Sequence, residues 1–253
     1  MRLLAIDSAT ERLALAAVDD GRGRPPARGL TRADCRIEAL DLDGGAAASA
    51  NALPAALELL DRLGWRFSDL DAIAFGRGPG GFTGLRTACA VAQGLAFGQG
   101  LPVVPVDSLA IVAEDAARGQ ALSPVWVLMD ARMGEIYAGC YANAGEQGWR
   151  AVVEPELTNP ERLMAAWRAD PPRLVAGSAL SAFAEQLATG AALRVSQERG
   201  RAAALGWLAA AGLARGDALP ADQALPFYLR DKVALTTAER EAARRARAGK
   251  EDA

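Results

Sequence analysis

The sequence predicts an α/β protein built from two related lobes, and two observations carry this prediction. First, an apolar strand at 70–75, a glycine-rich turn, a helix at 83–97 and an apolar strand at 101–106 follow one another. This order is typical of a βαβ unit with parallel strands. Second, Ala5-Ile6-Asp7, a polar turn and an apolar strand have an echo around Asp130, about half the chain later. The echo indicates a duplicated fold whose Asp-bearing turns face a shared cleft; two unrelated hairpins are the alternative.

The elements before the βαβ unit follow from short apolar runs separated by turn residues. Residues 21–34 begin with a run rich in Gly, Pro and Arg and predict an exposed loop. We expect strands at 3–6, 13–18 and around 36–42, and a helix at 51–63. Leu53, Leu57 and Leu60 share one face of that helix. Pro54 falls in its first turn, where the missing N–H is harmless.

The second half of the chain again alternates apolar strands with amphipathic helices. The expected strands are 125–129, 136–141 and 174–176, and the expected helices are 109–118, 160–168, 178–187 and 201–215. We expect an N-terminal, partner-binding lobe over residues 1–106, a C-terminal lobe over residues 107–230, and a charged tail over residues 231–253 that frays.

Composition excludes several classes of function. The chain has 253 residues, of which 51% are apolar, and this composition predicts a globular protein. Its net charge of −3 predicts no overall positive potential that would attract a polyanion such as a nucleic acid. It contains no histidine, which excludes histidine-based triads and predicts no metal site. Three dispersed cysteines fit a reducing cytosol. No signal peptide or membrane span is expected, because no apolar run reaches the roughly 20 residues that a bilayer requires. These patterns predict a cytoplasmic protein.

Two polar motifs allow a nucleotide site. Gly76-Arg77-Gly78-Pro79-Gly80-Gly81 follows a strand and opens a helix, the local context for holding a phosphate on backbone amides. Pro79 removes one such amide, and a tight turn explains the glycines equally well. Asp7 and its neighbouring hydroxyls can hold a magnesium-bound phosphate, or can simply form a hairpin turn. The candidate nucleotide-binding residues are Asp7, Ser8, Thr10, Gly78, Gly80 and Thr83.

The helix after the glycine-rich turn carries unusually small side chains. Leu85, Ala88, Ala92 and Leu95 lie at helical spacing on one face. At least one face of this helix must pack against the protein's own sheet. The small-residue face that remains can receive a helix of a partner.

Four segments in the same order resemble the bacterial TsaB family, also called YeaZ. The stretch from Gly76 to Arg86, extended through Ala96, resembles the family's signature. Ala5 to Glu11 resembles its opening, Asp130 to Tyr137 its central hairpin, and Pro226 to Arg230 its C-terminal motif. The resemblance spans nearly the whole chain. It implies the actin/sugar-kinase/Hsp70-like (ASKHA) fold, with two related α/β lobes, in agreement with the echo.

The resemblance also implies a function. TsaB proteins are non-catalytic partners of the catalytic subunit TsaD. With the ATPase TsaE, they support transfer of a threonylcarbamoyl group to N6 of adenosine 37, giving t6A in tRNAs that read codons beginning with A. In that family TsaD holds a metal with histidines, which this chain cannot supply. The resemblance implies no cofactor bound by this chain alone, leaves room for ATP or ADP in the assembled complex, and implies tRNA contact through the complex.

The same resemblance places the TsaD contact on two helices of the N-terminal lobe, and this surface can form a homodimer when TsaD is absent. The expected partner-binding residues are Leu53, Leu57, Leu60, Phe82, Leu85, Ala88, Ala92 and Leu95. The family usually has Ser where this chain has Gly81, and a His-Ser or His-Thr pair where this chain has Ala48-Ser49. The first difference removes a helix-capping hydroxyl and weakens the nucleotide assignment.

Two other functions remain open at this stage. A free-standing ATP-dependent small-molecule kinase of the same fold requires an adenosine pocket and a catalytic aspartate, for which Asp7 and Asp130 are available. A peptidase without histidine requires a serine–lysine or aspartic arrangement, and Lys232 and Lys250 are the only lysines.

Overall fold

The first lobe is built on a mixed five-stranded sheet. The computed structural model describes residues 1–21, 30–118 and 122–230. The strands are arranged in the order β3-β2-β1-β4-β5. Strands β1, β2 and β3 pair antiparallel, whereas β4 and β5 follow β1 in parallel. Their bounds are β1 Arg2–Asp7, β2 Arg12–Asp19, β3 Arg36–Asp43, β4 Ala72–Gly78 and β5 Val103–Asp107.

The second lobe repeats this topology. Its strands are arranged in the order β10-β9-β6-β7-β8, with β6, β7 and β8 antiparallel and β9 and β10 parallel to β6. Reading β6 as the counterpart of β1 makes the two sheets equivalent strand for strand, and this confirms the predicted duplication. The bounds are β6 Val125–Arg132, β7 Glu135–Asn143, β8 Trp149–Thr158, β9 Leu174–Ala176 and β10 Leu193–Val195.

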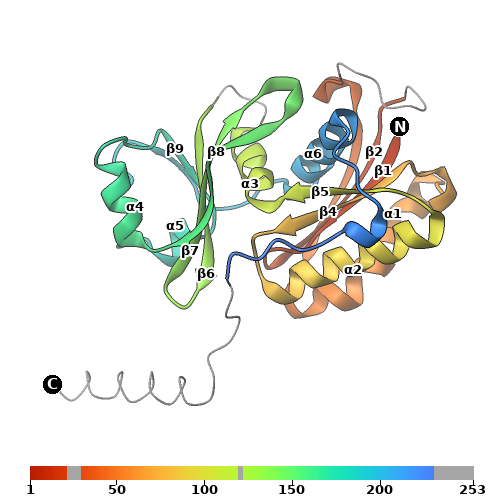
Figure 1. Cartoon of the computed structure of the whole chain (residues 1–253), viewed down its shortest axis with the longest axis horizontal. Coiled ribbons are helices and arrows are strands. Elements are labelled where there is room, and N and C mark those ends of the chain that lie inside the picture. The colour runs from red at the N-terminus through yellow and green to blue at the C-terminus, as the bar shows by residue number, and fades with distance from the viewer. Residues whose placement is uncertain (22–29, 119–121, 231–253) are drawn as a thin grey trace, which may run out of the picture.

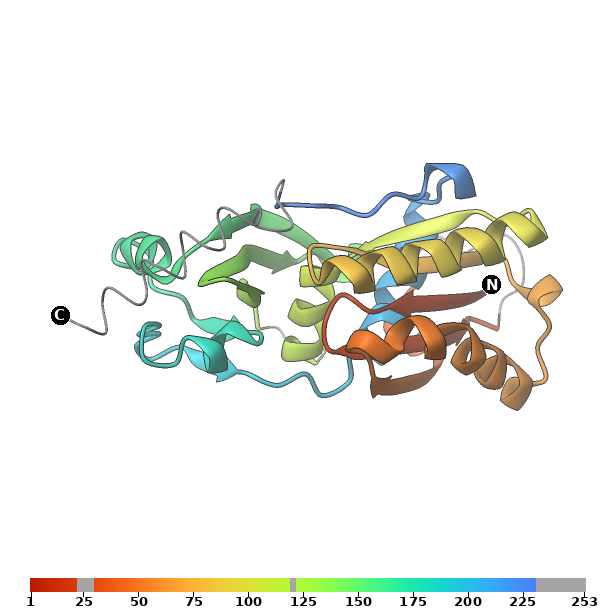
Figure 2. The ribbon, with the colours of Figure 1, turned by 90° about the horizontal axis from the view of Figure 1, so that it is seen from below.

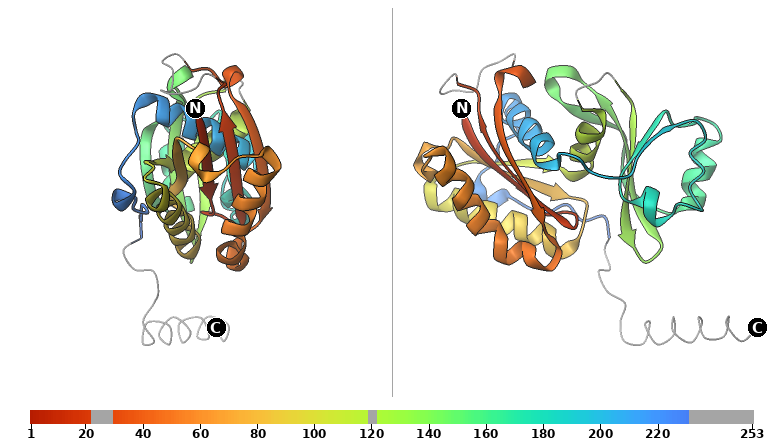
Figure 3. Two further views of the ribbon diagram at one scale, coloured as in Figure 1. Left: turned by 90° about the vertical axis from the view of Figure 1, so that its right-hand side faces the viewer. Right: turned by 180° about the vertical axis from the view of Figure 1, so that it is seen from behind.

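Helices cover both faces of the first sheet (Figure 1). Helices α1 (Ala48–Leu63) and α2 (Phe82–Gln99) pack on its outer face, around Leu4, Ile73 and Phe75. Helix α6 (Arg201–Arg215) packs on its inner face, and α3 (Ser108–Ala117) packs between α6 and the second sheet. Seen from behind in Figure 3, α3 and α6 lie between the two sheets.

The two lobes share one apolar core. Side chains of the first sheet, α3, α6 and one face of the second sheet form a single buried cluster. The other face of the second sheet packs on α4 (Pro160–Trp167) and the short α5 (Ala179–Ala182). Because α6 belongs to the second half of the sequence, the first sheet is covered by residues from both halves. The division into residues 1–106 and 107–230 stays a prediction.

Several elements differ from those expected. Helix α1 begins at Ala48, so Pro54 lies in its interior instead of its first turn; the side chain is exposed, and the ring occupies a solvent-facing position. The helix expected at 178–187 is helical only over Ala179–Ala182. Strands β8 and β10 were not expected. The predicted helix at 201–215 and strand at 174–176 are confirmed. The charged tail lies outside the described residues.

Candidate functional site

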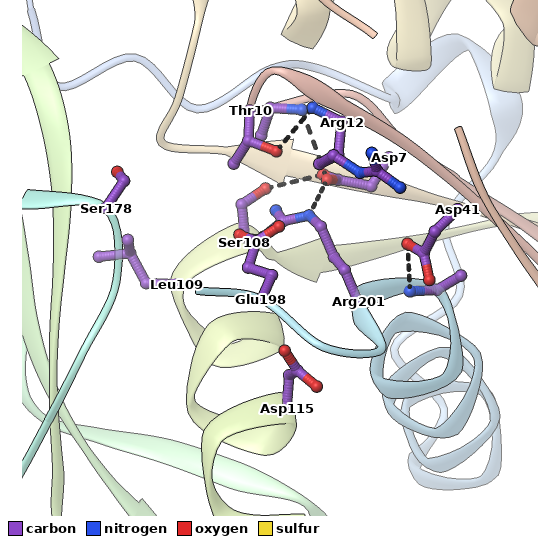
Figure 4. A network of polar contacts seen from close by, with 12 residues as sticks. Asp7, Thr10, Arg12, Asp41, Ser108, Leu109, Asp115, Ser178, Glu198 and Arg201 are labelled. Atoms are coloured by element: carbon purple, nitrogen blue, oxygen red, sulfur yellow. Dashed lines mark hydrogen bonds and ion pairs between the residues drawn. The ribbon is translucent and has the colours of Figure 1, made fainter. Parts of the chain in front are cut away.

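The carboxylate of Asp7 lies at the end of β1, where the predicted nucleotide residues converge. Its Oδ2 accepts a hydrogen bond from Nε of Arg201 at 2.7 Å, and its Oδ1 accepts one from Oγ of Ser108 at 3.1 Å (Figure 4). Asp7 and Arg201 are at most 1% exposed. Gly76 makes room for this carboxylate, since a Cβ there would lie 1.6 Å from Oδ1 of Asp7. Both carboxylate oxygens of Asp7 are therefore engaged inside the protein.

The other predicted nucleotide residues have mixed environments. Oγ of the buried Ser8 donates a hydrogen bond to the carbonyl of Gly84 at 2.8 Å. Gly78 and Gly80 are buried, whereas Thr83 is exposed and Thr10 is half-buried. The N-cap residue of α2 is Gly81, which provides no capping side chain, as expected from the difference from the family's Ser. The structure brings the six residues together, and their role in nucleotide binding stays a prediction.

A cleft of about 1240 Å³ lies between the lobes. Its walls come from the turn after β1, the start of α2, the β6–β7 hairpin and the segment before α6. The two Asp-bearing turns of the echo both line it, since Ser8 to Arg12 and Met129 to Met133 are among its residues. The predicted shared cleft is therefore present.

Charged groups with perturbed pKa values lie at the floor of this cleft. Burial raises the pKa of the Glu198 carboxyl and also raises that of Asp41. For Arg201, burial lowers the pKa, but the carboxylates of Asp7 and Glu198 outweigh that effect and raise it overall. The guanidinium of Arg201 therefore stays charged and is held by two carboxylates. Within the described part of the chain, no group of three or more His, Cys, Asp or Glu side chains could hold a metal ion.

The second candidate site is the outer face of α1 and α2, which lie side by side in Figure 2. Four of the eight predicted partner-binding residues, Leu60, Leu85, Ala88 and Ala92, are at most 2% exposed. Leu60, Ala88 and Ala92 belong to the lobe's own apolar core, and Leu85 lies against Gly78. These four side chains do not reach the surface, and the role of the eight residues in partner binding stays a prediction. Leu53 and Leu57 on α1 are exposed. Phe82 and Leu95 are half-buried.

The outward face of α2 consists of other residues. Ala90, Gly94, Phe97 and Gly98 are exposed, and Phe97 is 79% exposed. A Cβ added at Gly94 or Gly98 would meet no atom of the described chain within 4 Å. Small residues thus line the exposed side of the helix as well as its buried side. The small residues that face outward on α2 are therefore Ala90, Gly94 and Gly98, whereas Ala88 and Ala92 face the core.

A C-terminal strap, residues 219–230, borders this face, and its contacts were not foreseen. It begins with a bridge from Leu219 to Val103 of β5 and passes beside α2 (Figure 2). Tyr228 packs on Phe82 with ring centroids 5.4 Å apart, and its hydroxyl accepts a hydrogen bond from Arg86. At its end, Arg230 forms an ion pair with Glu135 of the second lobe. The family-like motif Pro226 to Arg230 was the only signal for this segment.

Two glycines of α2 should respond oppositely to the same substitution. Gly84→Ala places a Cβ 1.7 Å from the carbonyl oxygen of Ser8, so we expect a loss of about 2–3 kcal/mol in the free energy of unfolding. Gly94→Ala meets open space among the described residues and should gain up to about 1 kcal/mol from helix propensity. Urea denaturation of both variants measures this difference. Equal effects at both positions would contradict the assigned faces of the helix.

The fold and the cleft define a class of protein: two mixed five-stranded sheets of identical topology, flanked by helices, form an ASKHA fold. Residues 45–234 match the family described as TsaD: tRNA N6-adenosine threonylcarbamoyltransferase. The chain is 33% identical to the tRNA threonylcarbamoyladenosine biosynthesis protein TsaB of Escherichia coli over 174 residues, 66% of this chain and 69% of the relative. It is 37% identical to that of Haemophilus influenzae over 44% of this chain and 50% of the relative.

Solved structures agree with these relatives. YeaZ from Pseudomonas aeruginosa superposes with a TM-score of 0.75 and 37% identity, over 90% of this chain and 99% of that one. The chain belongs to the TsaB (YeaZ) family of tRNA threonylcarbamoyladenosine biosynthesis proteins. A further structure of a Pseudomonas aeruginosa protein, titled by its similarity to peptidase YEAZ, gives a TM-score of 0.76 at 36% identity, over 90% of this chain and 99% of that one. Across the described residues, no helix is long and apolar enough to cross a membrane.

Proposed function

We propose that this chain is a non-catalytic subunit of the t6A-forming machinery and acts by binding the catalytic subunit TsaD. Family membership supports a role in t6A biosynthesis. The observation that carries the proposal further is the exposed apolar face of α1 and α2. Leu53 and Leu57 are exposed on α1, Phe97 is exposed on α2, and a Cβ at Gly94 of α2 would meet no described atom. TsaE, tRNA and any ATP or ADP join through the assembled complex, in the cytoplasm.

The glycines of this face support a closely approaching partner. A glycine in an exposed helix costs about 1 kcal/mol relative to alanine. At Gly84 the close carbonyl of Ser8 leaves no room for a side chain, which explains why a glycine is kept there. At Gly94 and Gly98 no described atom of the chain lies close enough to require glycine. A helix of another protein crossing at these positions would explain it, because glycine lets two helix backbones come closer than the usual 8–10 Å between axes.

A non-catalytic role is supported by the chemistry of the cleft. The chain contains no histidine, and Asp7 at the end of β1 is committed to Arg201 and Ser108. An aspartate in this state does not offer a free carboxylate to a metal-bound phosphate. The catalytic chemistry is therefore assigned to the partner.

Co-purification with TsaD of the same organism, followed by a tRNA modification assay with each subunit omitted in turn, tests the proposal. We expect co-elution and a requirement for both proteins. Failure to associate, together with ATP turnover by the isolated chain, would favour the alternative of a free-standing kinase. Size-exclusion chromatography of the chain alone measures whether the same face forms a homodimer.

A further inference from the structure

The polypeptide passes between the lobes at two places before the C-terminal strap. The first crossing joins β5 of the first sheet to α3, at Asp107 and Ser108. The second crossing joins β10 of the second sheet to α6 of the first lobe, through residues 196–200. Any rotation of one lobe against the other must change backbone torsions at these two crossings. The groups that hold the crossings therefore control the angle between the lobes.

Both crossings are bonded to the same carboxylate. Ser108, at the first crossing, donates a hydrogen bond to Oδ1 of Asp7 and accepts one from the N–H of Gly78. Arg201, at the end of the second crossing, donates to Oδ2 of Asp7. Figure 4 shows the two side chains approaching Asp7 together. One buried aspartate thus joins the two connections between the lobes.

The second crossing is held along its length. Nη1 of Arg201 forms an ion pair with Glu198 at 2.7 Å. The N–H of Arg199 donates to Asp115, on the helix that follows the first crossing, at 2.7 Å. The N–H of Ala202 donates to Asp41 of β3 at 3.1 Å. The segment before α6 is consequently bonded to α3, and the first turn of α6 is bonded to the first sheet.

Burial separates the Asp7–Arg201 pair from the ion pair between the two Asp-bearing turns. The side chains of Asp7 and Arg201 are at most 1% exposed, so water cannot replace a broken contact. Arg132 of the second lobe also pairs with Glu11 of the first, but those side chains are 69% and 77% exposed. An exposed pair of this kind adds little and exchanges readily with water.

We propose that Asp7, Ser108 and Arg201 form a hinge lock that fixes the angle between the lobes and hence the width of the cleft. The lock belongs to this chain alone and does not depend on a partner. In this state the cleft stays open at one width, and its walls do not close on a ligand.

Distance measurements between spin labels test the lock in the full chain. Labels are placed on Ala46→Cys, at the first-lobe wall of the cleft, and on Glu185→Cys, in the second lobe, with Cys35→Ser removing the partly exposed native thiol. We expect a single narrow distance distribution for this parent, and a distribution at least about twofold broader for Arg201→Met, because domain motion is then released.

Arg201→Met leaves the buried carboxylate of Asp7 without its ion-pair partner, and the variant protein can fail to fold for that reason. A double variant keeps the test decisive in that case. Asp7→Leu with Arg201→Met removes both charges, which buried pairs often tolerate, and it should broaden the distribution in the same way. Glu11→Gln, which removes only the exposed pair with Arg132, is the matched control and should leave the parent distribution unchanged. A folded double variant with the parent's narrow distribution would overturn the proposal.

Discussion

Glutamate in place of Ala92 is expected to unfold the first lobe. Ala92 is fully buried between α2 and the sheet, among apolar side chains of the outer core. The larger side chain would overpack this layer, and its carboxylate would have no compensating charge there. We expect the free energy of unfolding to fall by about 4 kcal/mol or more, which removes much of the stability of an ordinary domain. Urea denaturation followed by circular dichroism measures it.

The control for this position is Ala92→Ser, which adds only one hydroxyl and should be far milder. If Ala92→Glu instead kept native stability, α2 would have to present the opposite face to solvent. Leu85 and Ala88 would then also be available to a partner.

The second large effect is expected two residues further along the same helix. Gly94→Glu places the same side chain on the exposed face, where a Cβ meets no described atom, so the isolated protein should stay folded. A carboxylate there would block the close approach of a partner helix and lose its hydration in the contact. We expect affinity for TsaD to fall by at least about 100-fold, together with t6A formation in the reconstituted assay.

Binding of purified proteins, measured by calorimetry, tests this result. Glu161→Gln on α4 of the second lobe changes one exposed charge far from the α1–α2 face and serves as the control. Leu57→Glu on α1, whose leucine is 48% exposed, should reproduce the effect of Gly94→Glu. Full affinity of both Gly94→Glu and Leu57→Glu would contradict the proposed TsaD contact on the α1–α2 face.

The sheets were predictable because their central strands are short apolar runs bounded by turn residues. The pattern identified β1, β2, β4 and β9 without any knowledge of pairing. Strand β8 is not predicted by this pattern, because it is an edge strand with mostly polar or exposed residues, such as Arg150, Glu154 and Glu156. Its position follows from pairing with β7, and pairing partners leave no trace in local composition.

The candidate site was only partly predictable for two physical reasons. Helix α2 has alanine or glycine on both its buried and its exposed sides, so periodicity could not decide which face packs on the sheet. Periodicity alone predicts Ala88 and Ala92 for the partner face as readily as Ala90 and Gly94, which face outward in the structure. The contact between Asp7 and Arg201 joins residues 194 positions apart. Only the arrangement of β1 and α6 in space brings these charges together.

The covering of the first sheet by α6 has a consequence for the order in which the protein matures during synthesis. Strands β1 to β5 leave the ribosome first, but their inner face is completed by a helix that spans Arg201–Arg215. At about 5–20 residues per second, this helix follows β5 by about 5 to 20 s. Throughout that interval the nascent sheet carries an uncovered apolar surface. The part of the chain made first is therefore finished last, and a fragment ending after β5 would lack the helix that covers its inner face.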